Sequence, residues 1–159
     1  MTKTIFITGA STGIGRATAK FFAAKGWKVI ATMRKPENET ELNVLDNVTV
    51  LPLDVTNPAQ IHKITQQALA LDDIDVVFNN AGYGLFGALE AMTDEQLVLQ
   101  METNFFGVVR VTQAFIPYFR KREAGLFITT GSSAGLMAFP VSSMYDASKF
   151  ALEAWSDTL

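Results

Sequence analysis

The stretch Ile5-Phe6-Ile7-Thr8-Gly9-Ala10-Ser11-Thr12-Gly13-Ile14-Gly15 decides the fold of this chain. A short β-rich run leads directly into a glycine-rich turn, after which the apolar residues recur at helical spacing. Backbone N–H groups in such a turn, together with the positive end of the helix dipole, can hold a pyrophosphate. The glycine spacing is G-x-x-x-G-x-G, and on its own it also fits a purely structural turn. Its place between a strand and a helix favours dinucleotide binding. The residues expected to contact the phosphates are Gly9, Ser11, Thr12, Gly13, Ile14 and Gly15.

The first helix is expected to bury a stripe formed by Ile14, Ala17, Phe21 and Ala24, and to end before Gly26. Strand-like and helix-like segments then alternate along the chain. We expect strands at 29–31, 48–51, 74–78 and 126–130, and helices at 58–71, from a capping box at 93–96 to about 119, and from about 145 onward.

This alternation, with several nearly continuous apolar strands, indicates a Rossmann-type doubly wound α/β fold. A parallel sheet would carry helices on both faces, and residues 1–159 would form a single domain. The last helix is expected to be still running at Leu159, and the strand at 126–130 would be an exposed sheet edge. We therefore expect the chain to lack C-terminal strands and helices of a longer domain.

Composition excludes several classes of function. The 159 residues include 13 Lys plus Arg against 16 Asp plus Glu, so a net charge of −3 argues against a nucleic-acid or anionic-membrane binder. The absence of cysteine removes disulfides and thiolate chemistry, and the single histidine, His62, lies in a polar stretch typical of a solvated helix. We expect no metal site. With no signal peptide or apolar span in the sequence, a cytoplasmic location is expected.

The end of the second strand indicates which dinucleotide is bound. An NAD site usually has a carboxylate there for the ribose 2′-hydroxyl, whereas this strand ends Thr32-Met33-Arg34-Lys35. The guanidinium of Arg34 offers paired donors to a 2′-phosphate. We therefore expect NADP(H) as the preferred cofactor and NAD(H) as the second choice. The alternative is that both cations are ordinary solvated charges.

Tyr145 and Lys149 are four residues apart, so on a helix they share one face. A nearby ammonium favours the phenolate, which a tyrosine needs for acid–base chemistry. Such a pair is weak evidence alone, but Ser132 precedes Tyr145 by 13 residues and follows the fifth strand, at the edge of the sheet where doubly wound proteins bind ligands.

Five motifs in order resemble those of the short-chain dehydrogenase/reductase family, across essentially the whole chain. They are the glycine turn at 8–15, Asn79-Asn80-Ala81-Gly82, Asn104, Gly131-Ser132-Ser133 and Tyr145-x-x-x-Lys149. The sequence around Asn104 and Tyr145 is most similar to that of hydroxysteroid and retinol dehydrogenase-like members of the family.

The resemblance implies an oxidoreductase that transfers a hydride between NADP(H) and an alcohol or carbonyl substrate. Tyr145 would be the acid–base, Lys149 would favour its phenolate and hold the nicotinamide ribose, and Ser132 would orient the substrate oxygen. Asn104 would position a water in a relay to Lys149, and the spacing to Tyr145 favours Ser132 over Ser133. Further cofactor contacts are implied for Asp54, Val55, Asn80, Ala81 and Gly82.

The resemblance also implies a homodimer or homotetramer, formed through the long helix and the helix that carries Tyr145. Phe139, Tyr83, Leu85 and Phe86 lie in loops expected at the mouth of the site, which favours an apolar substrate, although these residues could equally pack a loop. Thr12 stands where many NADP-preferring relatives carry a cation, so Arg34 would bear that preference largely alone.

Two other readings stay open at this stage. One is an NADP(H)-binding sensor or scaffold without turnover. The other is an epimerase or dehydratase of the sugar-nucleotide branch, although that branch usually has a different glycine spacing and an added domain.

Overall fold

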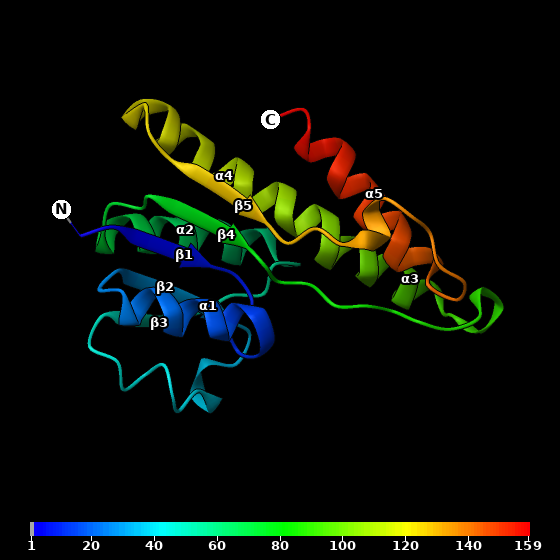
Figure 1. Ribbon diagram of the computed structural model, residues 1–159, viewed down its shortest axis with the longest axis horizontal. Helices are drawn as coiled ribbons and strands as arrows, with labels where there is room; N and C mark the ends of the chain where they lie inside the picture. Colours follow the sequence, from blue (N-terminus) through cyan, green and yellow to red (C-terminus); the bar gives the residue numbers. More distant parts are fainter. Residues whose placement is uncertain (1) are drawn as a thin grey trace.

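The computed structural model describes residues 2–159 and has a five-stranded parallel sheet at its centre (Figure 1). The spatial order of the strands is β3-β2-β1-β4-β5, so the order reverses between β1 and β4. This is the doubly wound arrangement predicted from the sequence. The strands are β1 (Thr4–Ile7), β2 (Lys28–Met33), β3 (Val48–Pro52), β4 (Val76–Asn79) and β5 (Leu126–Thr129).

Between residues 2 and 159, five α-helices and a π-helical turn connect and follow the strands. They are α1 (Gly13–Ala24), α2 (Pro58–Leu71), α3 (Asp94–Met101), the π-turn η3 (Glu102–Phe106), α4 (Gly107–Arg122) and α5 (Ser143–Ser156). Short 3-10 turns lie at Pro36–Asn38, Leu89–Ala91 and Ser133–Gly135.

The predicted helix starts at α2 and α3 are confirmed. The side chain of Asn57 accepts a hydrogen bond from the backbone of Gln60 at 3.1 Å, with Pro58 in the first helical position. Thr93 and Gln96 form the reciprocal capping box at the start of α3.

Each face of the sheet buries its own apolar cluster. Phe6 of β1 points toward α2 and α4, where it packs among Ile64, Val111 and Phe115. The ring centroids of Phe6 and Phe115 are 5.0 Å apart. The alternate residues of β1 point toward α1, which lies on the opposite face (Figure 1). Helices therefore cover both faces, as predicted.

The buried face of α1 differs from the predicted stripe. Ile14 and Phe21 are 62% and 57% exposed, whereas the residues buried against the sheet are Gly15, Ala19 and Ala23. Both sets recur at helical spacing, so periodicity identified the helix correctly but assigned it the wrong face. Small side chains allow α1 to lie close to the sheet, and this close packing decides which face is buried.

The C-terminal half differs from expectation in two further places. The long helix predicted from residue 93 to about 119 is interrupted by η3, which places one wide turn between α3 and α4. The last helix ends at Ser156 rather than running to Leu159. The strand β5 is at the edge of the sheet, as expected, and exposes Leu126 and Ile128 by 53% and 40%.

Within residues 2–159, no helix is long and apolar enough to cross a membrane. The same residues contain no group of three or more His, Asp or Glu side chains placed to hold a metal ion. His62 is exposed on α2, as its polar surroundings predicted.

Candidate functional site

The glycine turn between β1 and α1 is closed on one side and open on the other. Gly9 has φ of +68°, and a Cβ atom there would lie 2.7 Å from the Cα of Ala81. Gly13 also has a positive φ, +54°, but a Cβ atom there would meet no atom within 4 Å. The turn therefore packs against the segment after β4 through Gly9 and presents its Gly13 side to open space.

Hydrogen bonds join this turn to the end of β4. The Thr8 hydroxyl oxygen accepts from the backbone N–H groups of Asn80 and Ala81, each at 3.0 Å. The Asn80 amide donates to the carbonyl oxygens of Thr8 and Gly9 at 3.1 and 3.0 Å. Doubly wound proteins bind their ligands at the point where the strand order reverses. In this chain, hydrogen bonds within the protein already hold that point in place.

A cleft of about 860 Å³ runs from the glycine turn to α5. Every residue predicted to contact the cofactor lines it except Gly15, which is buried on the sheet-facing side of α1. The predicted residues that line the cleft are Gly9, Ser11, Thr12, Gly13, Ile14, Arg34, Asp54, Val55, Asn80, Ala81, Gly82, Tyr145 and Lys149.

At the β2 end of the cleft, the side chains of Arg34 and Lys35 are exposed. Among residues 2–159, Arg34 has no hydrogen-bond or ion-pair partner, so its guanidinium remains available to a ligand. Asp54, across the cleft, accepts hydrogen bonds from the backbone N–H and the hydroxyl of Thr56 at 2.9 and 2.7 Å. This end therefore combines an unpaired cation with a carboxylate that is already engaged.

At the other end, α5 presents Tyr145 and Lys149 on one face. The Lys149 Nζ atom lies 6.0 Å from the centroid of the Tyr145 ring. The Tyr145 hydroxyl donates to the Ser132 hydroxyl oxygen at 3.2 Å, and Ser132 also accepts from the backbone N–H of Ala134 at 3.1 Å. A serine hydroxyl has two acceptor positions and one donor. Both acceptor positions are used, so the Ser132 proton is free to bond to a substrate oxygen.

Lys149 is 6% exposed, and within the described part of the chain its Nζ has one acceptor, the carbonyl oxygen of Thr130 at 2.6 Å. An ammonium group has three donors, so two remain for a ligand and for the tyrosine. Burial lowers the pKa of Lys149 below its ordinary value, and the nearby carboxylate of Glu153 partly offsets this effect.

Asn104 lies in the π-turn η3 and is 1% exposed. Its amide donates to the carbonyl oxygen of Tyr83 at 2.8 Å and to the hydroxyl of Ser148 at 3.2 Å. Its side-chain oxygen accepts from the Tyr83 backbone N–H at 3.0 Å. Asn104 therefore ties the segment after β4 to α5, and no hydrogen bond joins it to Lys149 among the described residues. The water relay remains a prediction.

The sequence analysis did not single out Gln100, a buried polar residue of this region. Gln100, which is fully buried, donates to the Tyr83 carbonyl at 3.0 Å and accepts from the Leu85 backbone N–H at 2.8 Å. Its spacing of four residues from Asn104 places both amides on one helix face, and that spacing was the available signal. Other cleft residues that the motifs did not identify are Met33, Leu53, Thr56, Gly84, Gln96, Leu99, Thr103 and Thr130.

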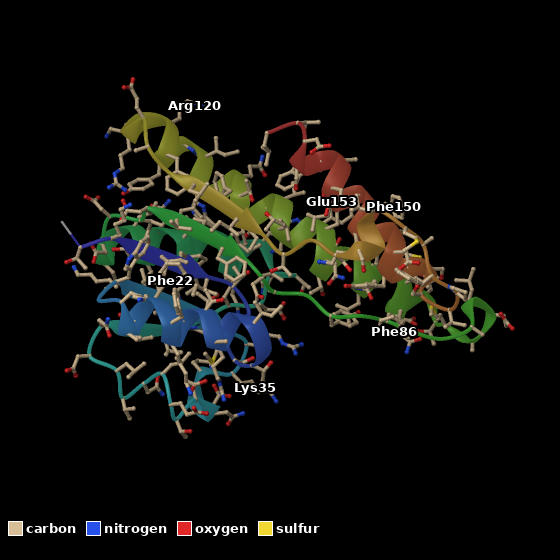
Figure 2. The ribbon with its side chains drawn as sticks, in the orientation of Figure 1. Phe22, Lys35, Phe86, Arg120, Phe150 and Glu153 are labelled. Atoms are coloured by element: carbon tan, nitrogen blue, oxygen red, sulfur yellow. The ribbon has the colours of Figure 1, made fainter. Side chains whose placement is uncertain are left out.

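Apolar side chains gather beside Tyr145, as predicted for the mouth of the site. Tyr83 and Leu85 line the cleft, and the ring centroid of Phe86 lies 5.6 Å from that of Tyr145. Figure 2 shows Phe86 on the extended segment after β4. Phe139 is 44% exposed but does not line the cleft. Apolar surface thus adjoins the hydroxyl groups of Tyr145 and Ser132.

The sequence that forms this site matches the model of a known protein family. The family model described as short chain dehydrogenase matches residues 3–159. A 3-ketodihydrosphingosine reductase of Bacteroides thetaiotaomicron is 42% identical over 156 residues, which make up 98% of this chain and 56% of that protein. The chain therefore spans a little more than half the length of this relative.

Two solved structures are similar over nearly the whole chain. An alcohol dehydrogenase from the archaeon Thermococcus sibiricus, complexed with 5-hydroxy-NADP, has a TM-score of 0.93 and 30% identity over 99% of this chain and 70% of its own. A short chain dehydrogenase/reductase from Burkholderia phymatum, in complex with NAD, has a TM-score of 0.92 and 30% identity over 99% of this chain and 58% of its own. The two carry different dinucleotides, so this likeness alone does not decide between NADP and NAD.

Proposed function

The chain belongs to the short-chain dehydrogenase family, and from that membership we propose that it carries the cofactor-binding and catalytic residues of an NADP(H)-dependent oxidoreductase. The reaction interconverts an alcohol and a carbonyl compound. The observation that carries the proposal is the contact, at 3.2 Å, between the Ser132 hydroxyl and the hydroxyl of Tyr145, which lines the α5 end of the cleft.

The cofactor supplies or accepts the hydride, and the protein supplies orientation and proton transfer. In the reductive direction, the Tyr145 hydroxyl gives its proton to the carbonyl oxygen, and in the oxidative direction the phenolate takes that proton back. Ser132 donates its free proton to the same oxygen and so fixes its position. Lys149, held by the Thr130 carbonyl, places positive charge beside the phenol and favours the phenolate.

The residues at the β2 end of the cleft support NADP(H) over NAD(H). Arg34 follows β2 where an NAD site would have a carboxylate, and it has no protein partner among residues 2–159. A guanidinium can bond to two phosphate oxygens at once. On the open side of Gly13, the turn leaves room for the backbone to approach a pyrophosphate. The chain therefore has donors for each anionic part of NADP(H).

Apolar surface beside Tyr145 supports an apolar alcohol or carbonyl substrate. Phe86 packs near the tyrosine ring, and Tyr83 and Leu85 line the adjoining cleft. A relative described as a 3-ketodihydrosphingosine reductase is named for a ketone substrate, which agrees with this chemistry.

We extend the proposal to a homodimer or homotetramer, since Phe106 and Phe150, on η3 and α5, are 41% and 43% exposed.

The proposed function is tested by Tyr145→Phe in the full-length protein, with NADPH and a panel of apolar ketones. Turnover should fall by about 10³-fold or more, because the proton donor is lost while the ring remains. The affinity for NADP(H), measured by calorimetry, should stay within about twofold. Tyr118→Phe, which removes a hydroxyl that bonds to Asp73 and Ile74 away from the cleft, is the control. Unchanged turnover in Tyr145→Phe would overturn the mechanism.

A further inference from the structure

The connection between β2 and β3 carries the proposed phosphate-binding cation, and three of its acidic residues follow that cation closely. Glu37, Glu39 and Glu41 follow Arg34 within seven positions. Carboxylates this close to a bound phosphate would repel it, and they could also pair with Arg34 and occupy it. The orientation of these glutamates therefore bears directly on whether Arg34 can bind a phosphate.

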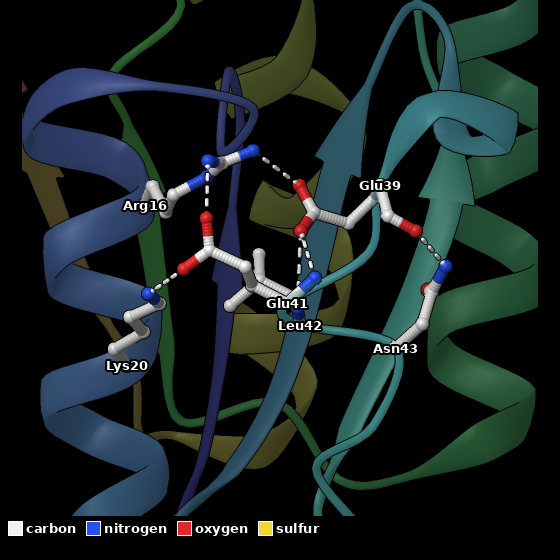
Figure 3. A network of polar contacts seen from close by, with 6 residues as sticks. All are labelled: Arg16, Lys20, Glu39, Glu41, Leu42 and Asn43. Atoms are coloured by element: carbon white, nitrogen blue, oxygen red, sulfur yellow. Dashed lines mark hydrogen bonds and ion pairs between the residues drawn. The ribbon is translucent and has the colours of Figure 1, made fainter.

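Glu39 is turned away from the cleft and buried beneath α1, and its side chain is 0% exposed. One carboxylate oxygen accepts from the guanidinium of Arg16 at 2.8 Å, and the other accepts from the backbone N–H groups of Glu41 and Leu42 at 2.8 and 3.0 Å (Figure 3). Burial alone would raise the pKa of Glu39, but these N–H groups and Arg16 outweigh it, and the pKa is lowered. Glu39 is therefore a buried anion with a full set of donors.

Glu41 is also held by cations of α1. Its carboxylate accepts from Arg16 at 2.9 Å and from the ammonium group of Lys20 (Figure 3). Arg16 thus bridges both glutamates, one with each terminal nitrogen. Hydrogen bonding to Lys20 and the two positive charges lower the pKa of Glu41. Two of the three carboxylates are neutralised by α1.

Arg16 joins the two walls of the cleft at its β2 end. It follows Gly15 in the first turn of α1, directly after the residues of the glycine turn that line the cleft. Glu39 lies five residues after Arg34, and Leu42, fully buried in the cluster beneath α1, anchors the same connection. The ion pair therefore ties the segment that carries Arg34 to the helix that carries the phosphate-binding turn.

We propose that Arg16 and Glu39 are positioning residues that select an adenosine carrying a 2′-phosphate. Arg16 holds the β2–β3 connection against α1 and keeps Glu39 and Glu41 engaged, so that Arg34 faces the cleft unpaired. Neither residue lines the cleft, so both act through Arg34. The inference rests on the proposed function only in taking NADP(H) as the cofactor.

The test uses two probes that differ only in the 2′-phosphate, 2′,5′-ADP and 5′-AMP, titrated calorimetrically into the full-length protein. The wild type should bind 2′,5′-ADP more tightly. In Arg16→Gln, we expect the affinity for 2′,5′-ADP to fall by about tenfold and that for 5′-AMP by less than about twofold. Arg122→Gln, which breaks a similar partly exposed pair with Asp75 at the opposite end of β4, should change neither.

A second variant separates charge masking from simple loosening of the fold. In the double variant Arg16→Gln with Glu39→Gln, the released carboxylate is gone, so most of the preference for 2′,5′-ADP should return. If Arg16→Gln proves too unstable to titrate, Arg16→Lys keeps the charge but not the two-armed contact, and it should give an intermediate preference.

Each outcome decides a different statement. A wild-type protein that binds both probes equally would overturn the NADP(H) proposal and this inference together. If Arg16→Gln keeps the wild-type preference for 2′,5′-ADP, or if its affinities for both probes fall by the same factor, the inference alone would be overturned. Failure of the double variant to recover the preference would also overturn it, because charge masking would then have no role.

Discussion

The two ends of the cleft are built by different means. At the β2 end, the phosphate-binding part of the site is backbone, namely a glycine turn, the helix start behind it and the ends of β1 and β4, and Arg34 is the side chain added to it. At the α5 end, side chains form it, since Tyr145 bonds to Ser132 and Asn104 ties the segment at Tyr83 to α5. A backbone site depends on where glycine stands in the sequence. A side-chain site depends on partners far apart in the chain, so the two ends should respond differently to mutation.

After Tyr145→Phe, the largest effect is expected for Ser132→Ala at the α5 end. The substrate oxygen would lose a preorganised donor, and kcat should fall by about 10²–10³-fold with little change in cofactor affinity. Ser133→Ala is the matched control, because Ser133 is the neighbouring serine, is exposed, and makes no side-chain hydrogen bond among the described residues. Steady-state kinetics of both variants decide the assignment, and a larger loss in Ser133→Ala would reverse it.

At the β2 end, we expect Gly9→Ala to destabilise the fold more than Gly13→Ala. Both residues have a positive φ, but a Cβ atom at Gly9 would also lie 2.7 Å from the Ala81 backbone. Gly9→Ala should lower the free energy of unfolding by about 3 kcal/mol, and Gly13→Ala by about 1 kcal/mol. Urea unfolding measures both. Equal losses would show that contact with the segment after β4 does not constrain the turn.

This contrast also explains which parts of the molecule could be predicted. The strand order and the glycine turn follow from local patterns, because turn chemistry and apolar period are encoded within a few residues. The prediction for the buried face of α1 was wrong because Gly15, Ala19 and Ala23 offer less apolar surface than Ile14 and Phe21, yet it is the small residues that pack against the sheet. Periodicity alone does not show which of two helix faces has side chains small enough to pack against the sheet.

The α5 end was predicted less completely for another physical reason. The motif spacing identified Ser132, Tyr145 and Lys149, and the structure places the first two in contact. The π-turn at Glu102–Phe106 adds one residue to a helical turn without a composition signal, and it sets the direction of Asn104. The partners of Asn104, Tyr83 and Ser148, are 21 and 44 residues away in sequence. Such contacts arise only from the packed fold.

A smaller effect is expected for Asn104→Ala, which tests the long-range contacts of the α5 end. The backbone N–H of Tyr83 would lose its acceptor inside the protein, while the Tyr83 carbonyl would lose one donor and keep that of Gln100, at a cost of about 2 kcal/mol in the free energy of unfolding. Asn38→Ala, at an exposed position without a side-chain hydrogen bond among residues 2–159, should change it by less than about 0.5 kcal/mol. Unfolding curves for both variants provide the test, and equal curves would mean that Asn104 is not a structural tie.

The smallest effect is the pH dependence contributed by Lys149. Burial lowers the pKa of this lysine in the folded protein, so between that pKa and the ordinary value near 10.5 the unfolded chain binds more protons. The free energy of unfolding contributed by Lys149 must therefore rise with pH across this interval, by about 1.4 kcal/mol for each unit that separates the two pKa values.

Urea unfolding of the wild type and of Lys149→Met at pH 7, 8.5 and 10 measures this contribution. The wild type should gain stability relative to Lys149→Met as the pH rises, because the charged form that is costly to bury becomes less populated. Groups common to both proteins cancel in the difference. Parallel profiles would mean that Lys149 titrates alike in the folded and unfolded states. The charge needed beside Tyr145 would then impose no pH-dependent cost on the fold.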